Sequence, residues 1–167
     1  TTTYNCCLKT AEADENGNAI QYQYDANSRL IKVSDALAGQ TQYQYDGNGN
    51  RVAVIDARGN ATAYAYDDLN RLTAITYADG AVEQFEYDAA GRKKAATDPL
   101  GRRTEYQYDQ YGRLTTTVLP PDPEISPNPM TVTRSYDNLG NVLTETDANG
   151  NVTQYQYDAL NRRVKVI

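Results

Sequence analysis

Residues Tyr87–Asp109 read YDAAGRKKAATDPLGRRTEYQYD, and this stretch holds one complete copy of a unit that the whole chain repeats. The unit opens and closes on a Tyr-Asp pair, and successive pairs along the 167 residues lie 21, 21, 21, 21, 28 and 21 residues apart. Self-similarity at a fixed period predicts a repeat architecture, in which each unit is one supersecondary element that stacks on its neighbours. The pairs are Tyr24-Asp25, Tyr45-Asp46, Tyr66-Asp67, Tyr87-Asp88, Tyr108-Asp109, Tyr136-Asp137 and Tyr157-Asp158.

Each repeat contains two predicted turns. Glycine follows aspartate at the fourth position both from Asp88 to Gly91 and from Asp98 to Gly101. An Asp side chain accepts a hydrogen bond from the backbone two residues on, and Gly tolerates positive φ, so the spacing predicts a type I turn followed by a left-handed residue. Such turns close three-residue hairpin loops with a β-bulge. The predicted structural signature is therefore the seven Tyr-Asp pairs together with Gly91, Arg92, Gly112, Arg113 and Gly140.

The arginine after each turn is expected to contact the preceding Asp or to lie on a tyrosine ring. Some copies depart from the unit at the turn glycine, at this arginine or in the mid-repeat turn. The replacements are Ser28, Asn70 and Asn161 for glycine and Asn50 and Asn141 for arginine, and looser turns are expected around Gly39 and Gly80.

Short segments rich in Tyr, Thr, Val and Ile lie between the turns, and their length and composition are typical of β-strands. Short strands with a turn every ten or eleven residues predict an all-β fold, here a repetitive strip of antiparallel β-hairpins. The Tyr-X-Tyr strand ends place two rings on one face of the strip. The expected strands include Gln40 to Tyr45, Arg51 to Ile55, Ala61 to Tyr66, Leu72 to Tyr77, Arg103 to Tyr108 and Val152 to Tyr157.

Composition excludes several classes of function. The net charge of −6 and the pI near 4.6 argue against a nucleic-acid partner, because binding to phosphates depends on Lys and Arg. No apolar run reaches the length of a membrane span. The 15 tyrosines supply apolar area that a thin aliphatic content lacks, which indicates a thin, tyrosine-packed structure.

Motifs that suggest chemistry have simpler structural explanations. Asp46 to Asn50 resembles half of a calcium loop, but the glycine and glutamate that such a loop needs are absent. The prominent carboxylates repeat with the period at turn corners, and the chain has no histidine, so we expect no catalytic, cofactor or metal site and no enzyme activity. Cys6 and Cys7 are adjacent and predict no disulfide framework. The sequons at Asn60 and Asn151 follow from the repeat itself.

The step of 28 residues contains an insertion. Residues Val118 to Met130 read VLPPDPEISPNPM and hold five of the six prolines. Proline removes donors from a sheet ladder and stiffens the backbone, so we expect a loop on the repeat frame and not a domain boundary. Residues 1–167 are therefore predicted to form a single repeat array with a Pro-rich loop at 118–130.

The unit YD-X-X-GR, repeated in register from Tyr4 to Ile167, resembles the YD repeats of the Rhs family, which also occur in Tc-toxin cocoons, wall-associated bacterial proteins and teneurins. The resemblance implies a strip that spirals into a hollow shell and, in toxin-bearing members, encloses a C-terminal effector. It also implies a secreted or cell-surface bacterial protein, with the rest of a parent chain and an enclosed effector as partners. We expect this chain to be a segment of such a wall.

Two functions fit the repeat pattern and the family resemblance. The first is a structural, non-catalytic role in the encapsulating β-shell of an Rhs-type secreted toxin. The alternative is an adhesive or carbohydrate-binding cell-wall module that presents tyrosine rings to glycans. Unpaired strand edges predict self-association in either case.

Overall fold

The computed structural model describes residues 2–5, 7–122, 124 and 128–167. All the regular elements of these residues are β-strands joined by turns. The chain divides into two compact units, Thr1–Val82 and Glu83–Ile167. Both units are built from the same repeat, and the predicted single array of residues 1–167 stays a prediction.

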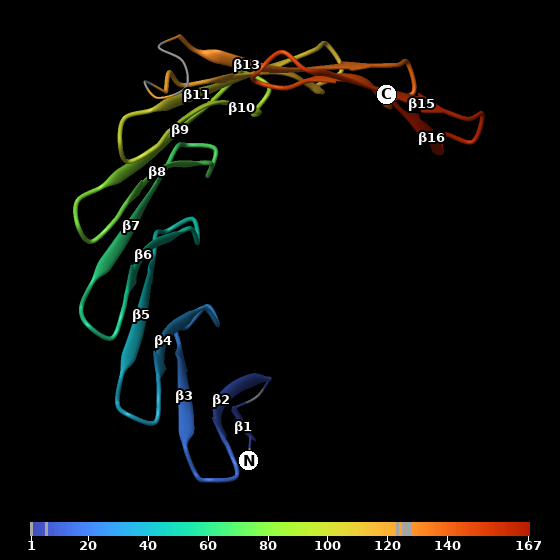
Figure 1. Ribbon diagram of the computed structural model, residues 1–167. Coiled ribbons are helices and arrows are strands. Elements are labelled where there is room, and N and C mark those ends of the chain that lie inside the picture. The colour runs from blue at the N-terminus through green and yellow to red at the C-terminus, as the bar shows by residue number, and fades with distance from the viewer. Residues whose placement is uncertain (1, 6, 123, 125–127) are drawn as a thin grey trace. The chain divides into compact units, whose positions relative to one another are not determined.

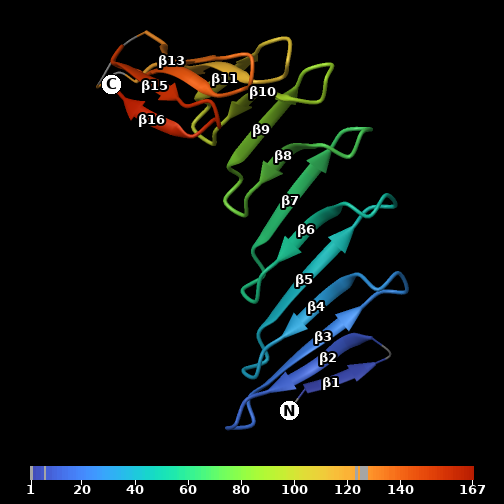
Figure 2. The ribbon, with the colours of Figure 1, turned by 90° about the vertical axis from the view of Figure 1, so that its right-hand side faces the viewer.

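The first unit is a series of antiparallel hairpins. Each strand pairs with its neighbours in the chain, and Figure 2 shows the resulting ladder from the third strand to the eighth. The strands are β1 (Thr2–Asn5), β2 (Leu8–Ala13), β3 (Ala19–Tyr24), β4 (Leu30–Ser34), β5 (Gln40–Tyr45), β6 (Arg51–Ile55), β7 (Ala61–Tyr66) and β8 (Leu72–Thr76).

The second unit repeats this arrangement. Consecutive strands again pair antiparallel, which confirms the predicted all-β hairpin fold. The strands are β9 (Val82–Tyr87), β10 (Lys93–Thr97), β11 (Arg103–Tyr108), β12 (Leu114–Leu119), β13 (Met130–Tyr136), β14 (Val142–Thr146), β15 (Val152–Tyr157) and β16 (Arg163–Val166).

The hairpin turns close by one shared pair of backbone hydrogen bonds, and Figure 1 shows these turns along β3 to β8. In the turn that begins at Asp88, the amide of Asp88 donates to the Arg92 carbonyl at 2.9 Å and the amide of Gly91 donates to the Asp88 carbonyl at 3.0 Å. Gly91 has a φ of 80°, and Ser28 and Asn70 adopt φ values of 62° and 59° at the same position of their own turns. The predicted type I turn with a left-handed fourth residue is therefore confirmed.

The two looser mid-repeat turns expected around Gly39 and Gly80 are present, and each lacks one residue of the usual Asp-X-X-Gly pattern. In the turn that begins at Asp35, the left-handed residue is Ala38, with a φ of 64°, and Gly39 occupies the next position. The other turn begins at Tyr77, and Gly80 is its left-handed residue with a φ of 85°. The backbone hydrogen bonds thus impose the turn even where the preferred residue types are missing.

Hairpins that are closed by a Tyr-Asp turn carry a β-bulge beside the tyrosine. In the pair β3–β4, Tyr24 lies opposite Leu30 and Gln23 lies opposite Lys32, so that Ile31 has no partner residue. The same shift occurs at Tyr45, Tyr66, Tyr87, Tyr108, Tyr136 and Tyr157. A bulge strengthens the local twist, and here it recurs once per repeat on the same edge.

Each unit is thin, with almost no buried residue, as the composition predicted. The only fully buried residue among those described is Ala95 in β10, whose exposed fraction is 0%. Ala95 lies directly opposite Glu86 and Glu105 on the adjacent strands. Arg103 bridges these two carboxylates, with Nη2 at 3.1 Å from Glu86 Oε2 and Nε at 3.0 Å from Glu105 Oε1. The ion pairs thus join the two strands that flank Ala95.

The tyrosine rings share one face of each unit, which we call the tyrosine face. Tyr22 lies opposite Val33, and Tyr43 lies opposite Val54, so rings and aliphatic side chains alternate across the strands. Glutamines such as Gln23 and Gln44 are exposed on the opposite face. Along β3 and β5, half-buried tyrosines therefore alternate with exposed glutamines.

The predicted boundaries hold with small differences. The strand expected to reach Tyr77 ends at Thr76, because Tyr77 begins a turn. In the Pro-rich segment, β12 extends to Leu119 and β13 starts at Met130, so the loop is shorter than the predicted 118–130. Residues 123 and 125–127 of that segment, and Cys6 near the first strand, lie outside the described residues.

Replacing Ala38 by glycine should stabilise the protein by about 0.5 to 1 kcal/mol, because alanine is strained at positive φ and glycine is not. The free energy of unfolding from chemical denaturation measures the change. Ala36→Gly in the same turn is the matched control and should give no gain, since Ala36 does not have positive φ. Equal effects of the two substitutions would contradict the assigned turn geometry.

Candidate functional site

The repeated chemistry of this chain lies on the edge that carries the Tyr-Asp turns. In the turn at Asp88, Oδ1 accepts hydrogen bonds from the backbone amides of Ala90 and Arg92, both at 2.9 Å. The other carboxylate oxygen, Oδ2, accepts from Arg92 Nε at 2.7 Å. The aspartate therefore closes its own turn and at the same time fixes the direction of the arginine side chain.

The guanidinium of Arg92 then reaches the next hairpin. It lies over the ring of Tyr108 at 4.7 Å from the ring centroid, and its Nη1 donates to the carbonyl of Asp109 at 3.3 Å. The Tyr108 hydroxyl returns a hydrogen bond to the Lys93 carbonyl at 2.8 Å. We call this set, an Asp and Arg of one turn with the Tyr and Asp of the next Tyr-Asp turn, the YD clasp.

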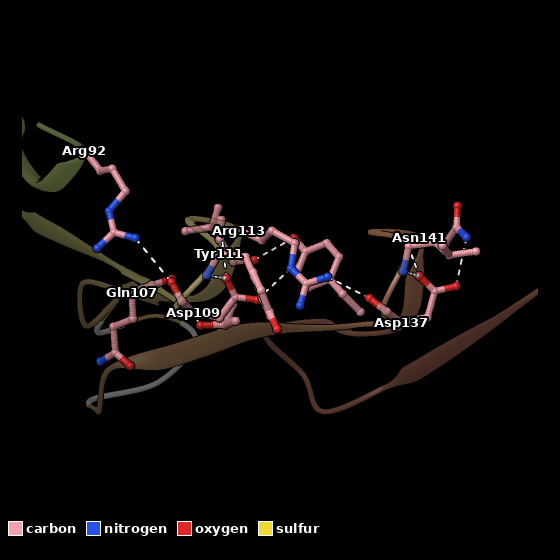
Figure 3. A network of polar contacts seen from close by, with 11 residues as sticks. Arg92, Gln107, Asp109, Tyr111, Arg113, Asp137 and Asn141 are labelled. Atoms are coloured by element: carbon pink, nitrogen blue, oxygen red, sulfur yellow. Dashed lines mark hydrogen bonds and ion pairs between the residues drawn. The ribbon is translucent and has the colours of Figure 1, made fainter. Parts of the chain in front are cut away.

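The YD clasp recurs along the second unit. Arg113 is held by Asp109 at 2.6 Å, lies over the Tyr136 ring at 4.7 Å, and donates to the Asp137 carbonyl at 2.7 Å. Figure 3 shows the resulting chain of contacts from Arg92 through Asp109 and Arg113 to Asp137. Three successive Tyr-Asp turns, at Asp88, Asp109 and Asp137, are thus joined by side-chain contacts in addition to the backbone hydrogen bonds of the sheet.

The first unit contains the same contacts. Arg29 binds Asp25 Oδ2 at 2.7 Å, lies over the Tyr45 ring at 4.8 Å, and donates to the Asp46 carbonyl at 3.2 Å. The Tyr45 hydroxyl donates to the Leu30 carbonyl at 2.9 Å. Both alternatives expected for the arginine, an ion pair with Asp and a contact with a ring, therefore occur together.

Asparagine replaces the arginine in two places, and the next turn changes with it. Asn50 Nδ2 donates to Asp46 Oδ2 at 2.9 Å and to Asn70 Oδ1 at 2.7 Å. In the second unit, Asn141 Nδ2 donates to Asn161 Oδ1 at 3.1 Å. Where Asn replaces the arginine of one Tyr-Asp turn, the left-handed residue of the next Tyr-Asp turn is therefore also Asn. Where the arginine is present, as at Arg29, Arg92 and Arg113, the left-handed residue of the next Tyr-Asp turn is glycine, namely Gly49, Gly112 and Gly140.

The turns on the opposite edge close on themselves. Asn60 Nδ2 donates to Asp56 Oδ2 at 2.8 Å, and Asn151 Nδ2 donates to Asp147 Oδ2 at 2.8 Å. These are the asparagines of the two N-glycosylation sequons, and their side-chain amides already donate hydrogen bonds within their own turns. Attachment of a glycan there would remove a contact that each turn uses.

Ion pairs also organise the tyrosine face. Glu12 accepts a hydrogen bond from the Tyr22 hydroxyl at 2.6 Å and pairs with Lys9. In the sixth repeat Arg134 occupies the place of the first tyrosine and pairs with Glu145 at 2.5 Å. The Tyr155 hydroxyl donates to the same carboxylate at 3.3 Å.

The turn carboxylates are held ionised by these contacts. The backbone amide and the guanidinium of Arg92 lower the pKa of Asp88, against a desolvation that raises it. The amide and side chain of Arg29 do the same for the pKa of Asp25. A carboxylate that is fixed by several donors is a weak base and a poor general acid at neutral pH.

Across the described residues, no cluster of three or more metal-binding side chains is present, and no apolar helix has the length of a membrane span. The calcium-like residues Asp46 to Asn50 form an ordinary turn, in which Asp46 Oδ1 accepts from the amides of Asn48 and Asn50.

The predicted signature residues occupy repeated positions, and the structure adds contacts between repeats that the sequence did not indicate. Each Asp of the seven Tyr-Asp pairs begins a turn, and each Tyr ends a strand. The Asn50–Asn70 and Asn141–Asn161 pairs were not predicted, although their co-occurrence two turns apart was visible in the sequence. The function of the signature residues stays a prediction.

Comparison with known proteins places this geometry in a family. The sequence model of the family described as Teneurin YD-shell matches residues 8–166. The agreement confirms the resemblance to YD repeats. No curated protein sequence matches the chain significantly.

Solved structures share the fold. The crystal structure of TcdB2-TccC3-TEV is similar with a TM-score of 0.76 and 19% identity, over 96% of this chain and 9% of that chain. The crystal structure of TcdB2-TccC3 without its hypervariable C-terminal region gives a TM-score of 0.64 and 16% identity, over 99% of this chain and 13% of that one. The Photorhabdus luminescens Tc holotoxin pore gives 0.61 and 17%, over 99% and 12%. This chain therefore spans only a small share of those chains, and the likeness concerns the fold.

Truncation of a clasp arginine should cost more than truncation of an arginine outside the clasp. Arg92→Ala is expected to lower the free energy of unfolding by about 1 to 3 kcal/mol, because a ring contact, an ion pair and a hydrogen bond are lost. Arg102→Ala is the matched control, since among the described residues the ion pair of Arg102 is with Asp98 of its own turn, and its side chain is 57% exposed. It should cost less than about 1 kcal/mol. Equal losses in chemical denaturation would contradict a role for the clasp.

Acid should weaken the strip in a narrow range of pH. The folded pKa of Asp25 and Asp88 is lowered, so their contribution to stability is complete above the unfolded pKa of about 3.9 and is lost as the pH falls below it. We expect the denaturation midpoint to stay constant from about pH 7 to 5 and to fall below about pH 4. Asp88→Asn should show a smaller acid loss than the unchanged protein. A midpoint that falls already near pH 6, or that stays constant to pH 2, would disagree with this assignment.

Proposed function

Because this chain belongs to the teneurin YD-shell family, we propose that it forms part of the wall of an encapsulating β-shell in an Rhs-type secreted toxin. Its role is structural and non-catalytic. The partners are the rest of a parent chain and an effector enclosed by the shell, and the location is secreted or at the bacterial cell surface. The similarity to Tc-toxin structures supports a shell role, since those chains contain the same fold as a part of a longer polypeptide.

One observation carries the proposal: the repeated side chains are used to join neighbouring hairpins. Arg92 and Arg113 each connect one turn to the next, and the Tyr108 and Tyr136 hydroxyls each bond to the backbone of the preceding hairpin. A single-layer sheet that is reinforced in this way extends sideways without needing a second layer. That property suits a wall.

Glycan binding by the tyrosines finds less support. The rings of Tyr45, Tyr108 and Tyr136 are each covered by an arginine of the YD clasp. Arg51 also lies over Tyr43 and Tyr64, at 5.9 and 5.5 Å from the ring centroids. A sugar that stacks on these rings would have to displace a cation first. Self-association through unpaired strand edges stays a separate proposal, which light scattering of this chain would test.

Encapsulation is tested by limited proteolysis of the native parent protein. If the strip walls off a cargo, part of the polypeptide outside the YD repeats should resist proteinase K until the shell is opened by denaturant. Free cargo segment, added separately to the same reaction, is the control and should be digested at once. Immediate digestion of every segment outside the repeats in the native protein would refute encapsulation. Glycan-array binding that is lost on Tyr→Ala substitution would favour the adhesive alternative.

A further inference from the structure

Three turns of the chain contain an asparagine followed directly by a glycine, the pair of residues most prone to spontaneous deamidation. The pairs are Asn16-Gly17, Asn48-Gly49 and Asn149-Gly150. Glycine has no side chain to shield its own amide nitrogen, so that nitrogen can approach the side-chain carbon of the preceding asparagine. In each pair the asparagine is exposed and third in its turn, and the glycine has positive φ.

Deamidation at such a pair proceeds in two balanced steps. The glycine amide nitrogen attacks Cγ of the asparagine, a new C–N bond forms, and the Cγ–Nδ2 bond breaks, so that ammonia leaves with the amide proton. Water then opens the cyclic imide at one of its two carbonyls, which gives aspartate or isoaspartate. Either product replaces a neutral amide by a carboxylate, and isoaspartate also lengthens the backbone by a methylene group.

The folded turn restrains all three sites in the same way. The glycine amide that has to attack donates a hydrogen bond to the carbonyl of the aspartate that begins the turn. The distance between nitrogen and oxygen is 3.2 Å for Gly17, 3.2 Å for Gly49 and 3.0 Å for Gly150. Because this hydrogen bond must break in every case, it does not make one site more labile than another.

Asn48 has a second restraint that the other two asparagines lack among the described residues. Its Nδ2 donates to Asn70 Oδ1 at 3.1 Å, and the same oxygen accepts from Asn50 Nδ2 at 2.7 Å. Asn70 belongs to the next Tyr-Asp turn, so the amide that would leave is tied to a neighbouring hairpin. In the described part of the chain, Asn16 and Asn149 donate from their backbone amides, at 2.9 Å to the aspartate of their own turn, and not from their side chains.

The flanking residues alone predict the opposite order of lability. Asn48 lies between two glycines, whereas a glutamate precedes Asn16 and an alanine precedes Asn149. In an unfolded chain Asn48 is therefore the least hindered of the three. A net intramolecular hydrogen bond shifts an equilibrium by about two- to ten-fold, which is enough to reverse a modest preference of this kind.

We propose that Asn16 and Asn149 are sites of spontaneous deamidation and isoaspartate formation in the folded protein, and that the hydrogen bond to Asn70 protects Asn48. The two labile turns lie on the edge opposite the Tyr-Asp turns, where each turn closes on itself. The new carboxylates thus arise away from the link that Asn48 and Asn70 form between two hairpins. This chemistry requires only water and is independent of the shell role.

Peptide mapping by mass spectrometry measures the three rates in one sample, because each conversion changes the mass of its own peptide. In the native protein at mildly alkaline pH, Asn48 should convert about two- to ten-fold more slowly than Asn16 and Asn149. In urea, where the contact with Asn70 is lost, Asn48 should convert at least as fast as the other two. The proposal is overturned if native Asn48 converts as fast as Asn16 and Asn149, or if neither of these converts in the native protein.

A variant of the acceptor tests the protection directly. Asn70→Gly removes the side-chain oxygen and keeps the turn, since glycine is the residue of the regular repeat at this position of positive φ. Conversion of Asn48 should accelerate about two- to ten-fold, while Asn16 and Asn149 keep their rates as internal controls. Asn161→Gly makes the same change in the second unit and should leave the rate at Asn48 unchanged. An unaltered rate at Asn48 in the Asn70→Gly variant would show that the contact gives no protection.

Discussion

The contact on which the strip depends most is that of an arginine guanidinium with two successive turns. Arg92 is oriented by Asp88 of its own turn and reaches across to the ring of Tyr108 and the carbonyl of Asp109. A sheet of one layer lacks the buried core that usually stabilises a domain, and only Ala95 is fully buried among the described residues. Stability must then come from the backbone ladder and from side chains that join one hairpin to the next.

Much of this fold follows from local chemistry and was predictable. Aspartate at the first position of a turn and a residue that tolerates positive φ at the fourth are sufficient to place Asp88 and Gly91, and alternation places the tyrosines on one face. Contacts between repeats were harder to predict, because they depend on the twist and register of strands 20 residues apart. The link from Asn50 to Asn70 and the left-handed Ala38 became evident only from the geometry.

The same contacts already engage the polar and aromatic groups of the candidate site. The carboxylates that look reactive in the sequence accept hydrogen bonds from their own turns, and the rings that look available for ligands carry guanidinium groups. What remains distinctive is found where the repeat is broken. At Ala96 a small residue replaces the bulkier Val33 and Val54 of the first unit, and at Leu119 the strand that precedes the insertion ends. Departures from the repeat unit therefore indicate where one repeat differs in chemistry from the next.

We infer that the YD-clasp residue of one Tyr-Asp turn and the left-handed residue of the next act as matched pairs, Arg with Gly and Asn with Asn. A double-mutant cycle on Arg92→Asn and Gly112→Asn tests it, since Asn141 and Asn161 show the second pairing within the same unit. Gly112 adjoins Arg92, because a Cβ built on it would lie 3.8 Å from Arg92 Nη1. The double variant should lose less free energy of unfolding than the two single variants together, by at least about 0.5 kcal/mol. Strict additivity of the two free energies of unfolding would contradict it.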